Sequence, residues 1–296
     1  MQLFFWRGKA RNFGDELNTL IWPRLLPDFF DDDPAEVFLG IGSILEAGHA
    51  ACALKVAAGA GYGGYAPAPT LDASWVVHWV RGPRTARRLG LPESYGLGDP
   101  AMLLPQAIWS GSPPGDAIGF MPHHDSLGRG AWHEAASAAG VKLIDPHGDP
   151  AAIIAAIGNC RVLLSEAMHG VIVADTLRVP WIALRPLAPV HHAKWLDCAE
   201  TLDLRIEFQR LAASSLTERL HASPLTSCRL GRLMADRSAE AVRHLARRRF
   251  IAVAAQALAQ AAVAAPQLST TTALDRCQTQ MLDRLDRLRR DPRRRT

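Results

Sequence analysis

The segment from Leu163 to Pro180, LLSEAMHGVIVADTLRVP, constrains the fold of this chain more than any other. Its apolar start, Val162 to Leu164, is typical of a buried parallel strand, and a helix-period stretch follows from Val171 to Leu177. His169 is therefore predicted in a strand-to-helix turn at the carboxyl edge of a sheet, where open α/β sheets bind ligands. The free N–H groups of the following helix favour an anion there. An imidazole beside an anion site suits proton transfer to an anionic substrate.

The same alternation of short apolar runs and helix-period segments recurs along the chain. Strands are predicted at Leu3–Trp6, Val37–Leu39, Leu54–Ala57, Trp75–Val80, Ala117–Met121, Val141–Ile144, Arg161–Leu164 and Trp181–Leu184. Helices are predicted at Asp15–Leu26, Thr85–Leu89, Trp132–Ala139 and Pro150–Gly158. Strands that alternate with helices indicate an α/β fold with parallel layers.

A Ser/Gly/Pro-rich stretch, Ile108 to Gly115, separates two such layers and is typical of a linker. The 296 residues exceed one average domain. We therefore predict two Rossmann-like domains that face each other across a cleft, with a helical C-terminal extension. The expected boundaries are 1–110 and 116–202 for the α/β domains, 203–266 for the helical extension and 267–296 for a basic tail. The tail is either disordered or an amphipathic helix with apolar positions from Leu274 to Leu288.

Charge and cysteine content exclude several function classes. The net charge is +4, and residues 284–296 alone hold seven Arg against two Asp, so nucleic acid is not an expected partner. Five scattered cysteines without a CxxC pair argue against a zinc site or a disulfide framework, and no metal is expected. Without a signal-like start or a membrane-length apolar run, we expect a cytoplasmic protein. The basic tail leaves open a peripheral contact with the inner face of the plasma membrane.

Six segments in series resemble the polysaccharide pyruvyl transferase family. They are NFGDELN (12–18), GIGSIL (40–45), VRGPRTARRLG (80–90), GDPAMLLP (98–105), GFMPHHD (119–125) and the segment 163–180. HHAKWLDCAETL (191–202) is similar to the Lys-Trp region of the exopolysaccharide-type members. The resemblance implies a glycosyltransferase-B-like fold. It also implies transfer of pyruvate from phosphoenolpyruvate to two hydroxyls of a sugar, with phosphate released and no cofactor beyond that co-substrate.

One position departs from the pattern of the wider family. Many members have Arg two residues before the equivalent of His169, where this chain has Ala167. The exopolysaccharide-type members share this variation, which therefore marks a subfamily. The anion contact that this Arg would make must then come from other residues or be absent.

Three residues are predicted to take part in catalysis. His169 is the expected acid and base, since imidazole both gives and takes a proton near neutral pH; the alternative is a hydrogen-bonded turn histidine. Glu166 is expected to orient His169 or to act as a second base, and otherwise caps the helix. Asp15 is expected to orient an acceptor hydroxyl or an arginine, and otherwise complements a helix dipole.

A donor with a carboxylate and a phosphate requires cationic side chains or helix N-termini. The residues assigned to the donor are Arg81, Arg84, Ser165, Gly170, His123, His124 and Lys194. Surface ion pairs are the alternative for the arginines, and solvated loop positions are the alternative for the histidines. His123, His124 and Asp125 could suggest a metal, but neighbouring side chains rarely converge on one ion.

The acceptor is expected to contact Asn12, Gly42, Ser43 and Trp195. Gly42 permits close backbone approach, Ser43 offers a hydroxyl, and the indole of Trp195 could stack on a sugar ring. A helix cap for Asn12 and a partly buried structural role for Trp195 are the alternatives. The acceptor is a saccharide, free or lipid-linked, and the sequence does not indicate an oligomeric state.

Two rival functions remain open at this point. The same scaffold could serve a glycosyltransferase that uses a nucleotide-sugar donor, because a fold alone does not fix the donor. The chain could also be a non-catalytic assembly protein for polysaccharide synthesis that binds through its helical C-terminus and basic tail. No sequence feature supplies a nucleobase pocket for the first rival, and His169, Arg81 and Asp15 count against the second.

Overall fold

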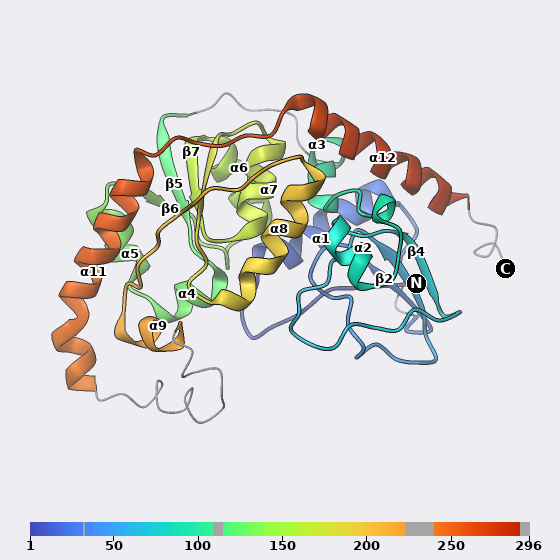
Figure 1. Ribbon diagram of the computed structural model, residues 1–296, viewed down its shortest axis with the longest axis horizontal. Helices are drawn as coiled ribbons and strands as arrows, with labels where there is room; N and C mark the ends of the chain where they lie inside the picture. The colour runs from blue at the N-terminus through green and yellow to red at the C-terminus, as the bar shows by residue number, and fades with distance from the viewer. Residues whose placement is uncertain (32, 109–114, 223–239, 291–296) are drawn as a thin grey trace. The chain divides into compact units, whose positions relative to one another are not determined.

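The computed structural model describes residues 1–31, 33–108, 115–222 and 240–290, with the backbone alone from 240 to 245 (Figure 1). The chain divides into two compact units. Unit 1 consists of Met1–Gly111, Ala193–Ile206 and Ser269–Thr296, and unit 2 consists of Ser112–His192 and Glu207–Leu268. Most of the expected linker, and residues 291–296 of the basic tail, lie outside the described ranges.

The two units use the chain differently from the contiguous domains expected from the sequence. Helix α8 (His192–Thr201) belongs almost wholly to unit 1, although it was expected in the second domain. The helical extension was expected at 203–266 as a separate part, whereas Glu207–Leu268 belongs to unit 2. Helix α12 (Thr271–Arg289) then returns to unit 1. Each unit is therefore completed by segments that lie far along the chain.

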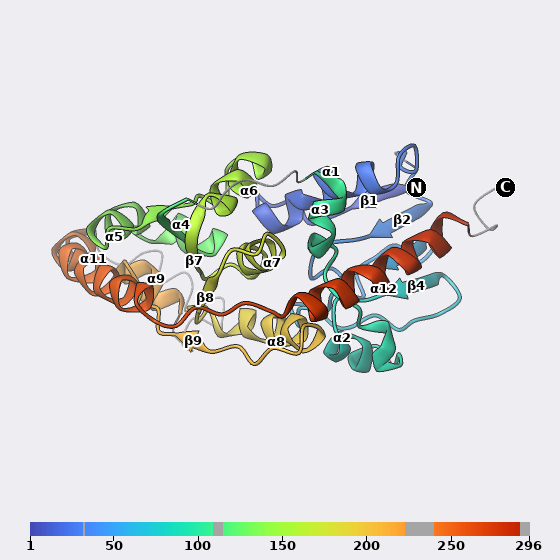
Figure 2. The same ribbon diagram turned by 90° about the horizontal axis from the view of Figure 1, so that it is seen from above.

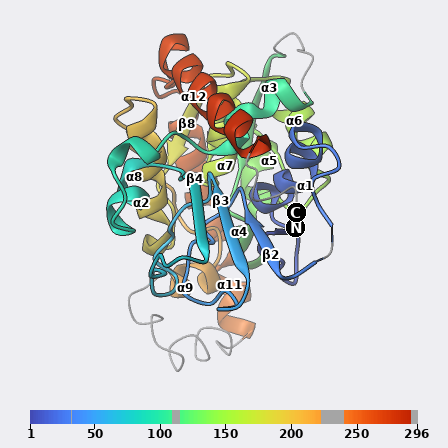
Figure 3. The same ribbon diagram turned by 90° about the vertical axis from the view of Figure 1, so that its right-hand side faces the viewer.

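Four parallel strands form the sheet of unit 1 in the order β1-β2-β3-β4. They are β1 (Gln2–Phe4), β2 (Glu36–Leu39), β3 (Leu54–Ala58) and β4 (Trp75–Trp79), and β2, β3 and β4 are seen side by side in Figure 3. Phe4 pairs with Leu39, and Leu39 pairs with Ala57. The strand expected at Leu3–Trp6 ends at Phe4, so Trp6 lies beyond the sheet in the loop that leads to α1.

The helices of unit 1 are mostly short. They are α1 (Phe13–Leu25), α2 (Pro83–Arg88), the 3-10 turns η1 (Glu93–Tyr95) and η2 (Pro100–Leu103), α3 (Leu104–Ala107), α8 and α12. The predicted amphipathic helix is confirmed in α12, whose apolar residues Leu274, Cys277, Met281, Leu285 and Leu288 are buried. This face packs into unit 1. No helix in the described part of the chain combines the length and apolar character needed to span a bilayer.

Five parallel strands form the sheet of unit 2 in the order β6-β5-β7-β8-β9. They are β5 (Ala117–Met121), β6 (Lys142–Leu143), β7 (Cys160–Ser165), β8 (Trp181–Leu184) and β9 (Phe208–Gln209). From β5 the chain continues to β6 at one edge of the sheet, whereas from β7 it continues to β8 and β9 toward the opposite edge. The strand order therefore reverses between β5 and β7, and ligands bind at the carboxyl ends of such strand pairs in open α/β sheets.

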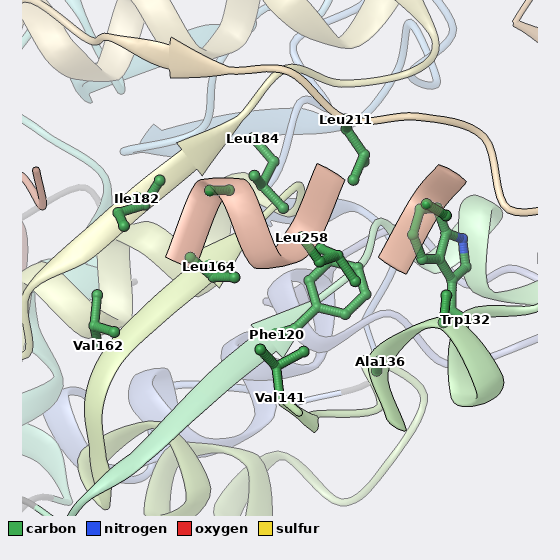
Figure 4. Close-up of a cluster of buried hydrophobic side chains, with 13 residues drawn as sticks. Phe120, Trp132, Ala136, Val141, Val162, Leu164, Ile182, Leu184, Leu211 and Leu258 are labelled. Carbon is green, nitrogen blue, oxygen red and sulfur yellow. The ribbon is translucent and has the colours of Figure 1, made fainter. Parts of the chain in front are cut away.

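Helices cover both faces of this sheet (Figure 1). They are α4 (His124–Arg129), α5 (Trp132–Ala138), α6 (Pro150–Gly158), α7 (Met168–Thr176), the turn η3 (Pro189–His191), α9 (Leu216–His221) and α11 (Glu240–Ala262). Helices α5 and α11 lie side by side on one face, whereas α6 and α7 pack on the other (Figures 1 and 2). The face under α5 and α11 holds a hydrophobic core. Figure 4 shows this core, in which Phe120, Leu164 and Leu184 of the strands lie near Trp132 of α5 and Leu258 of α11.

Candidate functional site

Glu166 fixes the loops at the carboxyl edge of the unit 2 sheet. Its carboxylate accepts hydrogen bonds from the backbone N–H groups of His123 and Leu187, both at 2.9 Å. It also accepts a bond from the hydroxyl of Ser126 at 3.1 Å. Its own N–H donates to the carbonyl of Met121 at 2.9 Å. Glu166 thereby joins the loops that follow β5, β7 and β8.

The Glu166 side chain is only 1% exposed. Burial raises the pKa of Glu166, since desolvation of the ionised carboxylate outweighs the three hydrogen bonds that favour it. The residue was expected to orient His169, to act as a base or to cap a helix. Its three donors are instead His123 and Leu187, in the loops after β5 and β8, and Ser126 of α4, in agreement with a role in positioning these segments.

His169 lies in the first turn of α7, directly after the loop that follows β7, and is half-buried. The expected strand, turn and helix are all present. The helix begins at Met168, before the predicted start at Val171, because Ala167 already has the extended conformation of an N-cap residue. The imidazole therefore belongs to the helix N-terminus itself, where backbone N–H groups favour an anion.

Ser165 and Gly170 shape this turn. The Ser165 hydroxyl donates to the carbonyl of Ala167 at 2.8 Å and accepts from its N–H at 3.1 Å, so it closes the turn from a fully buried position. A Cβ at Gly170 would lie 2.6 Å from that hydroxyl and 2.8 Å from the sulfur of Met121. Only glycine lets α7 pack this closely on β5 and β7. Both residues support His169 structurally, and direct donor contact stays a prediction.

His123 and His124 lie directly after β5, and further histidines gather around them. The rings of His123 and His191 are stacked with centroids 4.0 Å apart, and the rings of His123 and His124 are 4.4 Å apart. The Nε2 atom of His147 lies 3.1 Å from the carbonyl oxygen of His124. These imidazoles place several hydrogen-bonding ring nitrogens side by side at the sheet edge. The sequence analysis identified His123 and His124 but missed His147 and His191, which follow other strands.

Asp125 lies among these histidines. Nitrogen atoms of His123, His124 and His191 each lie 3.9 Å from one of its carboxylate oxygens. Ligand atoms of His123, His124 and Asp125 all fall within 4.8 Å of one another, which is a spacing that could hold a metal ion. These three side chains thus come closer together than the sequence led us to expect, and the absence of a metal there stays a prediction. The same imidazoles can equally donate hydrogen bonds to a phosphate.

A pocket opens beside this cluster in unit 2. Its lining comprises His123, Asp125, Ser126, Arg129, Leu187, Ala188, His191, Glu218, His221 and Ala222. Glu218 accepts hydrogen bonds from the indole N–H of Trp132 at 2.7 Å and the backbone N–H of Ser214 at 2.6 Å. Burial raises the pKa of Glu218 to about 7. No motif in the sequence indicated Arg129, Glu218 or His221. Glu218 and His221 lie on α9, in a segment that was expected only to pack as a helix on the rest of the protein.

Arg81 in unit 1 is fully engaged with its own unit. Its Nε donates to Asp197 at 3.1 Å, one terminal nitrogen donates to the hydroxyl of Ser43 at 2.9 Å, and the other donates to the carbonyl of Tyr62 at 3.1 Å. The side chain is 0% exposed. Asp197 also accepts from Thr85, so a buried network ties α8 to the loops after β2, β3 and β4. The expected contact of Arg81 with a donor anion would require this network to rearrange.

Arg84 forms an exposed ion pair with Glu200 at 2.7 Å, which is the surface alternative considered for it. Arg87 pairs with the same glutamate and with Glu93. Exposed pairs of this kind contribute little to stability and remain free to exchange partners. Donor binding by Arg84 therefore stays a prediction.

The loop before α1 gathers the acceptor candidates. Asn12 occupies the N-cap position, but its amide donates to the Asp15 carboxylate at 2.6 Å instead of capping the helix. A Cβ at Gly42 would lie 3.1 Å from Asp15 Oδ1, so the two residues are adjacent. Asn18, which the sequence analysis missed, joins α1 to the end of β2 through two hydrogen bonds with the backbone of Ile41 at 2.9 Å.

Lys194 and Trp195 lie on α8. Lys194 is half-buried, whereas Trp195 is only 1% exposed. A buried indole presents no face to a sugar ring, so the structure corrects the expected stacking role of Trp195 to core packing in unit 1. Trp195 therefore packs inside unit 1, while Lys194 remains partly exposed and its donor contact stays a prediction.

Comparison with known proteins relates this α/β chain to a family of transferases. Residues 70–186 match the model of the polysaccharide pyruvyl transferase family, and the chain belongs to that family, because similarity to a relative extends over its whole length. One such relative is the succinoglycan biosynthesis protein ExoV of Rhizobium meliloti (strain 1021). It is 33% identical over 316 residues, covering 98% of this chain and 99% of that protein. No solved structure matches the chain.

Proposed function

We propose that this chain transfers pyruvate from phosphoenolpyruvate to two hydroxyls of a saccharide, forming a cyclic ketal in exopolysaccharide biosynthesis. The observation that carries the proposal is the Glu166 junction, through which the His123 loop and the turn before His169 are fixed at one sheet edge. Family membership and the similarity to ExoV support the reaction class. The proposal retains the glycosyltransferase-B-like fold that the resemblance implies.

The proposed chemistry needs one proton carrier and a positively charged surround. Protonated His169 gives its proton to the methylene carbon of phosphoenolpyruvate, which makes C2 electrophilic. A sugar hydroxyl attacks C2 and returns its proton to the imidazole. The second hydroxyl then attacks C2 as the bond to the phosphate oxygen breaks, and the proton it loses leaves with inorganic phosphate. One donor and one diol thus give one ketal and one phosphate.

Three groups of residues have proposed roles. The N–H groups at the start of α7, with His123 and His124, bind the donor anion. Glu166 holds their loops in register. In unit 1, Asp15 with Asn12 and Ser43 orients the acceptor hydroxyls.

The test is the His169→Ala variant, incubated with phosphoenolpyruvate and candidate saccharides while phosphate release and product mass are followed. We expect loss of ketal formation by at least about 100-fold, the range typical of a lost general acid or base. His133→Ala, at an exposed position on α5, is the matched control and should keep full turnover. Turnover by His169→Ala close to that of the wild type would contradict the proposed role. Thermal stabilisation by a nucleotide diphosphate, and none by phosphoenolpyruvate, would favour a glycosyltransferase instead.

A further inference from the structure

Two aromatic side chains at the carboxyl edge of the unit 1 sheet are half exposed. Trp6, just past β1, is 49% exposed, and Tyr65, in the glycine-rich loop past β3, is 47% exposed. Strands β1 and β3 flank β2 in the sheet. Neighbouring strands are about 4.8 Å apart, so the two loops leave the sheet roughly 10 Å from each other. Both loops therefore start from the same edge of the sheet, on either side of β2.

Each of these rings lies against a glycine. A Cβ at Gly8 would lie 2.0 Å from the indole Cη2 of Trp6. A Cβ at Gly63 would lie 2.5 Å from Cε2 of Tyr65 and 2.7 Å from the Cβ of Ser43. The rings therefore rest directly on backbone and still expose about half of their surface. Large rigid rings held in this way provide contact area at low cost in conformational entropy.

Polar groups suited to sugar hydroxyls lie at the end of β2, between these two loops. Asp15 is adjacent to Gly42, and its carboxylate is held by the amide of Asn12 at 2.6 Å. The Ser43 hydroxyl accepts a hydrogen bond from Arg81 at 2.9 Å. Gly63 lies beside Ser43, since a Cβ at Gly63 would be 2.7 Å from the Cβ of Ser43. A carboxylate and an oriented hydroxyl at a sheet edge that also carries two half-exposed aromatic rings match the chemistry of a saccharide, which has apolar C–H faces and a polar rim.

We propose that Trp6 and Tyr65 form the platform on which the saccharide acceptor stacks, with Asp15 and Ser43 binding its hydroxyls. This inference rests on the proposed function for the identity of the ligand. It assigns to Trp6 and Tyr65 the stacking role that the buried Trp195 cannot perform.

The test measures saccharide binding without phosphoenolpyruvate by calorimetry, and then the KM for each substrate. The probes are cellobiose, lactose and a succinoglycan oligosaccharide. In Trp6→Ala and Tyr65→Ala we expect the KM for the saccharide to rise about tenfold, equivalent to ~1.4 kcal/mol, with the KM for phosphoenolpyruvate unchanged. Trp6→Phe and Tyr65→Phe keep a ring and should retain most of the affinity. Val263→Ala, at an exposed position in unit 2, is the control without effect.

Gly8→Ala is the sharpest variant, because it moves the Trp6 ring without deleting it. The three atoms nearest to its new Cβ all belong to the far end of the Trp6 indole, so we expect the ring to shift and the protein to fold while saccharide affinity falls. Unchanged saccharide affinity in the alanine variants overturns the platform, as does failure of every probe to bind the wild type. A dimer that dissociates on these substitutions would assign the rings to a second copy. Saccharide binding without pyruvate transfer would instead refute the proposed function and leave the platform in place.

Discussion

Removal of the Glu166 carboxylate is the most informative single change in unit 2. In Glu166→Ala, the N–H groups of His123 and Leu187 and the hydroxyl of Ser126 lose their acceptor in a site that is 1% exposed. A buried donor left without a partner costs about 1–3 kcal/mol. The Ser126 hydroxyl can rotate, so two backbone groups dominate. We expect the free energy of unfolding to fall by roughly 3–5 kcal/mol.

Glu166→Gln separates the hydrogen bonds from the charge. The oxygen that accepts from Ser126 and Leu187 is retained, whereas the amide nitrogen would face the N–H of His123. One bond is then lost, and the expected cost is about 1–3 kcal/mol. The predicted order of stability is therefore wild type, Glu166→Gln, Glu166→Ala.

Urea unfolding of the full chain, followed by tryptophan fluorescence, gives these free energies. Glu207→Ala, at an exposed position of unit 2, is the control and should remain within about 0.5 kcal/mol of the wild type. The reasoning fails if Glu166→Ala is as stable as this control, or if the two Glu166 variants are equally destabilised. Turnover adds a second readout. A positioning role leaves kcat of the folded Glu166→Gln protein within about tenfold of the wild type, whereas a base would lose about 100-fold or more.

Two further changes test the surroundings of the site. Glu218 keeps its proton in the folded state up to about pH 7, so its contribution to stability is fully present below the unfolded pKa of 4.5 and is lost as the pH rises towards 7. At 1.36 kcal/mol per pKa unit, the free energy of unfolding of the wild type should fall by about 3 kcal/mol between these pH values, relative to that of Glu218→Gln. Urea unfolding at several pH values measures this, and an equal pH dependence of the two proteins would contradict it. Gly170→Ala places a Cβ 2.6 Å from the Ser165 hydroxyl. It should lower the free energy of unfolding by about 1–3 kcal/mol and also lower turnover. Gly128→Ala, where a Cβ meets nothing within 4 Å, should cost far less by the same measurements.

The parallel layers could be predicted from sequence because buried parallel strands are continuous apolar runs. The strands at Ala117–Met121 and Trp181–Leu184 were predicted with their observed bounds. Strand β9 was missed, since its two residues are too few to show a period and lie in a stretch expected to be helical. The domain boundaries also differed, because α8 and α12 rejoin unit 1 after the chain has passed through unit 2. The order of predicted strands and helices along the sequence does not reveal which later segments pack back onto the first domain.

The candidate site residues that directly follow a strand could be predicted from the sequence. Those that reach the site from other connections could not. His169, Glu166 and His123 follow strands, and the register that pairs Met121 with Ser165 brings those ends together. His191 and Glu218 reach the same edge from η3 and α9, which no motif marks. Side chains that arrive from separate connections share a site only through tertiary packing.

Arg81 shows why a cation at a strand end cannot be assigned to an anion from sequence alone. Its charge is balanced by Asp197, which lies 116 residues away, and the two groups are both buried. A buried arginine that lost this carboxylate would be left uncompensated at a cost of several kcal/mol, so the pair resists recruitment by a passing ligand. In the proposed mechanism the donor is therefore bound by the histidines and the α7 N–H groups of unit 2. Arg81 contributes by holding the Ser43 hydroxyl and the Tyr62 carbonyl in the loops after β2 and β3 of unit 1.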